Sequence, residues 1–134
     1  MANILIIDDS CLQREHLLGV LCRCEHQGMA VGTLADAESV LGEFVPDLAL
    51  IELILFQQNG FQLGKALLDL GVKNVALMVA RYQQTDEIWA QKLGIRRIIV
   101  RPISSVNLLE IIDSLMAETS LRAGNEFLPG VNKC

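Results

Sequence analysis

Aromatic residues, proline and histidine are all scarce in this 134-residue sequence: aromatic residues make up 4%, prolines number three and histidines two. This scarcity of proline places the chain far from proline-rich disordered chains and from collagen. Basic residues are outnumbered too, with eleven Lys and Arg against sixteen Asp and Glu and a net charge of -5. They are also scattered along the chain, so we expect no direct binding to nucleic acid or to an anionic membrane.

Long apolar runs are missing as well. No run approaches the roughly 20 residues that span a bilayer, and no basic residue precedes the short apolar stretch at residues 4–7. We therefore expect no membrane span and no secretion signal, but a cytoplasmic protein whose four cysteines are reduced thiols.

The composition is sufficient for one folded domain. Hydrophobic residues make up 51% of the chain and charged residues 20%, so the chain can fill a core of its own. We predict a single domain over residues 1–120, followed by a flexible tail over residues 121–134, which contains Gly124, Pro129 and Gly130.

Short apolar runs alternate with segments of helical period, a pattern typical of repeated strand and helix units. The predicted strands cover residues 4–7, 29–34, 48–53, 75–79 and 97–100. The predicted helices cover residues 10–25, 36–44, 60–70 and 86–93. Ser104 is the expected N-cap of a last helix. Because the run at 48–53 is almost entirely apolar, it fits a central strand buried on both faces. The pattern therefore predicts an α/β fold with a doubly wound parallel sheet.

Charged side chains follow three of the predicted strands. Asp8 and Asp9 end the first strand, Glu52 lies near the end of the third, and Arg101 follows the fifth. Ligand sites of open parallel sheets form outside the carboxyl ends of the strands, so we expect these side chains to converge. Three anions in a partly desolvated pocket require a compensating cation, either Mg²⁺ or Arg101. A solvated acidic rim is the alternative interpretation.

Four segments together resemble the receiver domains of two-component response regulators: ILIIDDS at 4–10, PDLALIE at 46–52, NGF at 59–61 and VRP at 100–102, with Ser104 opening a helix. The resemblance covers about residues 3–117. It implies a flavodoxin-like fold, with five parallel strands in the order 2-1-3-4-5 and five helices around them. It also implies a cis peptide bond between Arg101 and Pro102.

The sequence departs from the family pattern where receivers accept and sense a phosphoryl group. The family's phosphoacceptor aspartate falls at Glu52, whose carboxylate lies one methylene further out. Misplacement by about 1 Å can cost roughly a hundredfold in the rate of such a reaction. The family's hydroxyl residue is Val79, which cannot donate a hydrogen bond, and its aromatic switch residue is Ile98. Its lysine is Arg101, whose planar fork prefers to grip a carboxylate.

These departures predict a pseudo-receiver: a protein-interaction module of a bacterial signalling pathway that is not an enzyme and works without phosphorylation. Glu52 then either forms an inert ion pair with Arg101 or imitates a phosphorylated aspartate. The missing donor at Val79 favours the inert pair, because a charge without a differential contact shifts no equilibrium. No cofactor is required, although Asp8, Asp9 and Glu52 could still bind Mg²⁺ weakly.

Two other functions compete with this prediction. The first is a stand-alone response regulator that is phosphorylated by a non-standard route at Glu52 or Asp9. The second is a small Mg²⁺-dependent phosphohydrolase, which would need a proton carrier near the strand ends. His16 and His26 lie on or just after the first predicted helix, away from that edge. A DNA-binding regulator is set aside, because only a short tail follows the receiver-like region.

Two surfaces are candidates for partner contact. Phe56 belongs to an apolar loop after the third strand, where an exposed aromatic would suit either a lid or a contact. Trp89, Arg96 and Arg97 lie on the fourth helix and fifth strand, where the family usually binds partners, although adjacent arginines are more often a solvated edge. The expected partner is a signalling protein, such as a kinase, an adaptor or a motility component. A homodimer is a further option.

Overall fold

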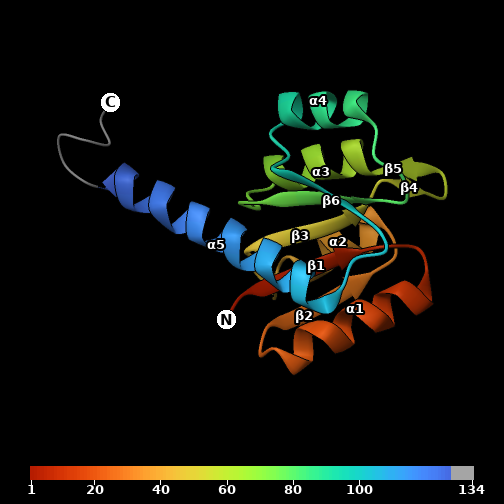
Figure 1. The fold of residues 1–134 in the computed structure, drawn as a ribbon, viewed down its shortest axis with the longest axis horizontal. Helices are drawn as coiled ribbons and strands as arrows, with labels where there is room; N and C mark the ends of the chain where they lie inside the picture. The colour runs from red at the N-terminus through yellow and green to blue at the C-terminus, as the bar shows by residue number, and fades with distance from the viewer. Residues whose placement is uncertain (128–134) are drawn as a thin grey trace. The chain divides into compact units, whose positions relative to one another are not determined.

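The computed structural model describes residues 1–127 and contains a five-stranded parallel sheet (Figure 1). Its strand order is β2-β1-β3-β6-β7, and every neighbouring pair runs parallel. The strands are β1 (Asn3–Ile7), β2 (Gln27–Val31), β3 (Leu48–Glu52), β6 (Val75–Val79) and β7 (Arg97–Val100). Numbered within the sheet alone, this is the order 2-1-3-4-5, so the predicted flavodoxin-like topology is confirmed.

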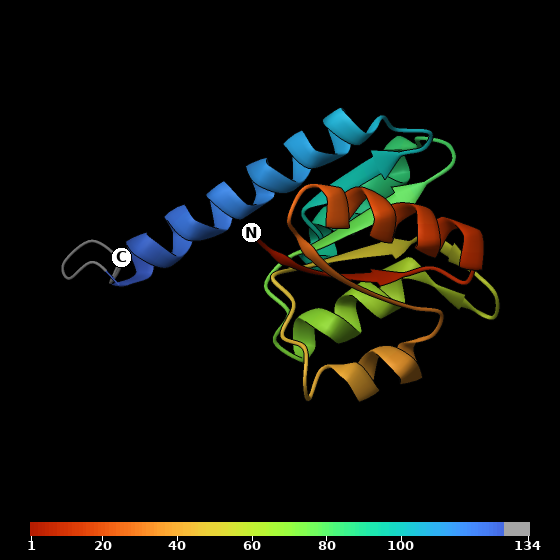
Figure 2. The same cartoon turned by 90° about the horizontal axis from the view of Figure 1, so that it is seen from below.

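The chain forms two compact units, Met1–Ile103 and the part that begins at Ser104. The helices of the first unit are α1 (Cys11–Arg23), α2 (Leu34–Val40), α3 (Gly60–Asp69) and α4 (Gln84–Leu93). Figure 2 shows α1 on one face of the sheet and α2 and α3 on the other. Two-sided cover explains why all five residues of β3 and of β6 are buried.

The second unit contains helix α5 (Ser105–Phe127). The Ser104 hydroxyl accepts a 3.1 Å hydrogen bond from the Asn107 amide, so the predicted N-cap is present. The helix continues past residue 121, where the predicted tail begins, and residues 128–134 of that tail lie outside the described residues. Among residues 1–127, no helix combines the length and the apolar character that a membrane crossing requires.

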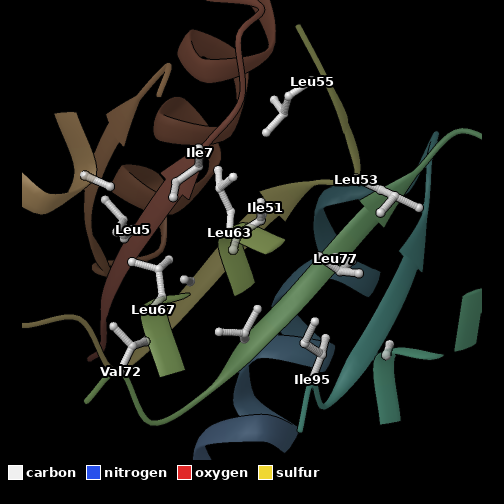
Figure 3. Packing of buried hydrophobic residues seen from close by; sticks show 14 of the residues in the cluster. Leu5, Ile7, Ile51, Leu53, Leu55, Leu63, Leu67, Val72, Leu77 and Ile95 are labelled. Atoms are coloured by element: carbon white, nitrogen blue, oxygen red, sulfur yellow. The ribbon is translucent and has the colours of Figure 1, made fainter. Parts of the chain in front are cut away.

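The main core of the first unit lies between the sheet and the helices on the α3 side (Figure 3). Leu63 and Leu67 of α3 pack there with Leu5, Ile51 and Leu77 of the strands. Their spacing of four residues puts both leucines on one face of α3, which accounts for the buried side of that helix.

Polar side chains cap α1 and α3 at the edge of the sheet where the strands end. The Ser10 hydroxyl accepts a 3.2 Å hydrogen bond from the amide of Gln13 and opens α1 directly after β1. Asn59 caps α3 in the same way through the Gln62 amide, at 3.0 Å. These turns hold the residues that follow β1 and β3 at one edge of the sheet.

A short antiparallel hairpin, β4 (Ile54–Leu55) and β5 (Gln58–Asn59), separates β3 from α3. The sequence pattern predicts only a loop here. Strands of two residues leave little pattern to detect, and the turn lacks the Asn-Gly or Asp-Gly pair that is the strongest short-range signal of a hairpin. Gln57 adopts the left-handed conformation that the turn requires, with φ of 62°. We call residues 54–59 the hairpin.

Candidate functional site at the carboxyl ends of the strands

A pocket of about 600 Å³ lies at the carboxyl ends of the parallel strands. Predicted site residues that line it are Asp8, Asp9, Glu52, Val79 and Arg101. The strand-end rule therefore places these residues together, as the sequence pattern indicates. Arg81 and Asp86 also line the pocket and were not singled out in advance, although they too follow the end of a predicted strand.

Glu52 is held by two contacts and is only 8% exposed. Its Oε1 forms an ion pair with Nη2 of Arg101. Its Oε2 accepts a 3.3 Å hydrogen bond from the backbone amide of Ile54, at the start of the hairpin. Both carboxylate oxygens at the family's phosphoacceptor position are therefore engaged within the protein.

Asp8 is more deeply buried, at 4% exposed. Its Oδ1 accepts a 2.9 Å hydrogen bond from the Ser10 amide. Its backbone carbonyl accepts a 2.6 Å hydrogen bond from Nη1 of Arg14, so a second arginine reaches the end of β1. The two carboxyls that the sheet edge buries, Asp8 and Glu52, thus have a backbone amide and an arginine beside each of them.

Burial governs the protonation of both groups. Removal from water raises the pKa of Glu52, an effect opposed by the Ile54 amide and by the charge of Arg101. Burial likewise raises the pKa of Asp8, opposed by the Ser10 amide and again by Arg101. The single guanidinium of Arg101 therefore does not fully offset the loss of hydration at the two carboxyls.

Asp9 differs from its neighbour, because its side chain is exposed. Its Oδ2 accepts a 2.7 Å hydrogen bond from the backbone amide of Phe56. Asp9 thus links the end of β1 to the turn of the hairpin.

The arrangement of these carboxylates bears on the expected Mg²⁺ site. Among residues 1–119, whose side chains the structure describes, no three His, Cys, Asp or Glu side chains are placed so that they could hold a metal ion. Asp8, Asp9 and Glu52 each accept a hydrogen bond from a backbone amide instead. As these side chains lie, they do not fit the predicted set of three oxygen ligands. Weak binding of Mg²⁺ stays a prediction.

The positions that correspond to the family's switch are apolar and packed. Val79 ends β6, lines the pocket and is 3% exposed. Ile98, on the neighbouring strand β7, is half-buried and packs against the core. Neither side chain can donate a hydrogen bond to an anion in the pocket. The Arg101–Pro102 peptide bond is cis, as the resemblance implies.

Comparison with known proteins agrees with this geometry, although no family model matches the sequence. The protein PilH of Pseudomonas aeruginosa is 28% identical over 120 residues, which cover 87% of this chain and 99% of PilH. The virulence transcriptional regulatory protein PhoP of Salmonella typhimurium is 26% identical over 121 residues. That match covers 90% of this chain and 54% of PhoP, so the chain spans about half the length of PhoP.

The solved structures give the same result. The CheY-like response regulator receiver domain from Methanospirillum hungatei superimposes with a TM-score of 0.82 at 18% identity, covering 90% of this chain and 97% of that one. The chain therefore has the fold of a solved receiver domain and is similar in sequence to PilH and PhoP. Glu52 lies at the edge of the sheet where the resemblance predicts the phosphoacceptor position.

The residues expected at partner surfaces lie in different settings. Phe56 is 78% exposed in the hairpin, and Trp89 is half-exposed on α4. Arg97 is exposed at the start of β7, but Arg96 is half-buried and its Nη1 is inaccessible to solvent. The two arginines therefore do not present a matched pair of charges, whereas Phe56 and Trp89 offer apolar surface.

Proposed function

We propose that this receiver is a pseudo-receiver, a protein-interaction module whose conformation is not set by phosphorylation. The observation that carries this proposal is the engagement of Glu52, which pairs with Arg101 through one oxygen and with the Ile54 amide through the other. A carboxylate that attacks phosphorus needs a free, ionised oxygen aimed at the incoming group. Neither requirement suits a buried glutamate with a raised pKa.

The surroundings of Glu52 support the same function. A phosphoryl group carries charge on its oxygens and is stabilised by donors aimed at them. Val79 presents methyl groups at the place where the family has a hydroxyl, and Arg101 already neutralises Glu52. A transferred phosphoryl group would meet an apolar wall and a cation that has to leave its present partner.

Of the two interpretations of Glu52, these contacts favour the inert ion pair. A phosphomimic would have to hold the protein in one of two states through contacts that the other state lacks. The apolar pair Val79 and Ile98 provides no polar contact that could sense the charge. Glu52 then fills and neutralises the pocket.

The proposed partner is a signalling protein of the bacterial cytoplasm, such as a kinase, an adaptor or a motility component. The proposed function is not enzymatic and includes no binding to nucleic acid or membrane. The exposed apolar side chains Phe56 and Trp89 support a protein partner, because such patches commonly mark protein interfaces. No cofactor is required for this role.

Incubation with acetyl phosphate and Mg²⁺, followed by intact-mass measurement, tests the proposal. We expect no added mass on the wild type, while an ordinary receiver in the same reaction gains one phosphate. The triple variant Glu52→Asp, Val79→Thr and Arg101→Lys restores the family's residues and should gain some phosphate. A stoichiometric gain by the wild type would overturn the proposal.

The same measurement tests the competing function, in which the chain is phosphorylated by a non-standard route. Asp9 is the better candidate on this structure, because its carboxylate is exposed at the rim of the pocket. If the wild type gains mass, the variants Asp9→Asn and Glu52→Gln identify the modified residue, since one of them loses the gain.

A further inference from the structure

We propose that this receiver self-associates through a reciprocal contact, in which the hairpin of each copy inserts Phe56 into the groove between α3 and α4 of the other. The inference goes beyond the proposed function, because it concerns the outer face of the hairpin and the groove between α3 and α4, not the carboxylate of Glu52. Every residue involved belongs to the first compact unit, Met1–Ile103.

The hairpin presents an apolar outer face. Ile54 is 80% exposed and Phe56 is 78% exposed, while Leu55 between them is 8% exposed and joins the core (Figure 3). Ile54 and Leu55 point to opposite sides of β4, as the two-residue period of a strand requires, and Phe56 is exposed in the turn that follows. Two large apolar side chains thus project together from a surface that costs free energy to hydrate.

The hairpin is also held in place before any partner binds. The Phe56 amide donates to Asp9 at 2.7 Å, and the Ile54 amide donates to Glu52 at 3.3 Å. Antiparallel pairing of β4 with β5 fixes the other side of the turn. Because the backbone that carries Phe56 is already ordered, little conformational entropy is lost when the ring becomes buried.

The groove has the complementary composition. It encloses about 360 Å³ between α3 and α4, and Phe61, Trp89 and Leu93 form much of its apolar wall. Lys65 and Asp69 line it as well and pair with each other at 2.7 Å, so they bring no unbalanced charge. An apolar floor beside a neutralised polar rim suits an aromatic side chain from a partner.

Hairpin and groove adjoin on one face, which is the reason to infer a second copy. The hairpin ends at Asn59, α3 begins at Gly60, and Phe61 already lines the groove. Figure 1 shows the hairpin beside the start of α3, with α4 next to that helix. Phe56 stays 78% exposed and so does not fill the groove of its own chain. A two-fold pair satisfies both surfaces twice, once in each direction.

Charge and size predict how strong the contact is. Each copy carries a net charge of -5, so two copies repel at long range, whereas the contact itself is apolar. Added salt screens that repulsion and should increase the dimer fraction. Two buried aromatic rings account for only about 300–500 Å² of surface, which is less than the roughly 1,200 Å² of a standard protein interface. We therefore expect a weak dimer whose fraction depends on protein concentration.

Sedimentation equilibrium of the full chain tests the proposal over a wide range of concentrations. We expect a reversible dimer for the wild type and an association roughly tenfold or more weaker for Phe56→Ala and for Trp89→Ala. Leu12→Ala is the matched control, because Leu12 is 77% exposed on α1 and should leave the dimer unchanged. Circular dichroism verifies that every variant is folded.

A mixture of the two variants gives the decisive result. Phe56→Ala keeps an intact groove and Trp89→Ala keeps an intact hairpin, so the mixed pair retains one of the two contacts. The mixture should therefore associate more strongly than either variant alone. A wild type that stays monomeric, a dimer that neither substitution weakens, or a mixture no stronger than its components would each overturn the proposal.

Discussion

The carboxylate of Asp9 accepts a 2.7 Å hydrogen bond from the backbone amide of Phe56, 47 positions further along the chain. The bond ties the turn of the hairpin to the end of β1, and the Ile54 amide forms a second tie to Glu52. Two acidic residues at the carboxyl ends of the strands therefore position the hairpin.

Loss of the Asp9 acceptor should loosen the hairpin. In Asp9→Ala we expect faster hydrogen exchange at the Phe56 amide and a decrease of about 0.5–1 kcal/mol in the free energy of unfolding, because the bond is exposed to water. Asp9→Asn is the control, since its side-chain oxygen can still accept the bond. Equal exchange in the two variants would show that the bond does not order the hairpin.

Breaking the ion pair from one side should cost more than removing it. Arg101→Met leaves the Glu52 carboxylate buried without its cation, so we expect a loss of about 2–3 kcal/mol in the free energy of unfolding. The double variant Glu52→Leu with Arg101→Met leaves no unpaired charge and should regain most of that loss. Urea unfolding of Glu52→Leu, Arg101→Met and the double variant measures the coupling energy between the two side chains. If the double variant loses the sum of the two single losses, the ion pair does not couple them.

The raised pKa values of Asp8 and Glu52 determine a pH dependence. A carboxyl whose pKa is higher in the folded state binds more protons when folded, so its stabilising effect is complete below the unfolded-state pKa and declines as pH increases. We expect the free energy of unfolding to decrease from about pH 4 upward and to level off above the folded-state pKa. Glu52→Gln should flatten part of this slope in urea unfolding at successive pH values. An unchanged slope would exclude Glu52 as its source.

The start of α3 should not tolerate a side chain. A Cβ at Gly60 would lie 2.8 Å from both the Glu52 carbonyl oxygen and the Leu53 Cα, and backbone cannot move aside easily. We expect Gly60→Ala to lower the free energy of unfolding by about 2–3 kcal/mol. At Gly42 a Cβ would meet nothing within 4 Å, so Gly42→Ala should change it by less than about 0.5 kcal/mol. Similar urea midpoints for the two variants would contradict this account.

The sequence predicts the buried strand β6 more closely than the edge strand β2. The predicted strand at 75–79 coincides with β6, because a continuous apolar run marks a strand that is covered on both faces. The predicted strand at 97–100 also coincides with β7, at the other edge of the sheet. β2 was predicted at 29–34 but lies at Gln27–Val31, where pairing of Gln27 with Asn3 sets the register although Gln27 and Gly28 are not strongly apolar. Tertiary pairing overrides local composition there.

The helices show a similar limit. Helix α2 was predicted at 36–44 and spans Leu34–Val40, because Thr33 supplies the cap and the chain turns directly after the helix. The apolar spacing that suggested a longer helix continues into that turn, where Leu41 and Phe44 still pack against the core. Side-chain burial therefore does not reveal where the helical backbone ends.

The candidate site, too, is predicted from the sequence only in part. The rule that ligands gather at strand ends selects Asp8, Asp9, Glu52 and Arg101 from the sequence alone, because it depends only on topology. The backbone partners of Asp9 and Glu52 lie in a hairpin that the sequence does not predict, and its turn places Gln57 at a positive φ. The sequence therefore predicts which charged residues meet, but only the structure shows that their carboxylates already have partners within the protein.

The ion pair of Glu52 with Arg101 has a consequence for regulation. In receivers of the ordinary kind, the signal is a phosphoryl group accepted by an aspartate. Here Arg101 already pairs with Glu52 in the pocket, so under the proposed function no phosphoryl group carries the signal. The amount of partner bound would then depend on the abundance of this protein. Synthesis and degradation would then be the steps at which a cell adjusts the signal.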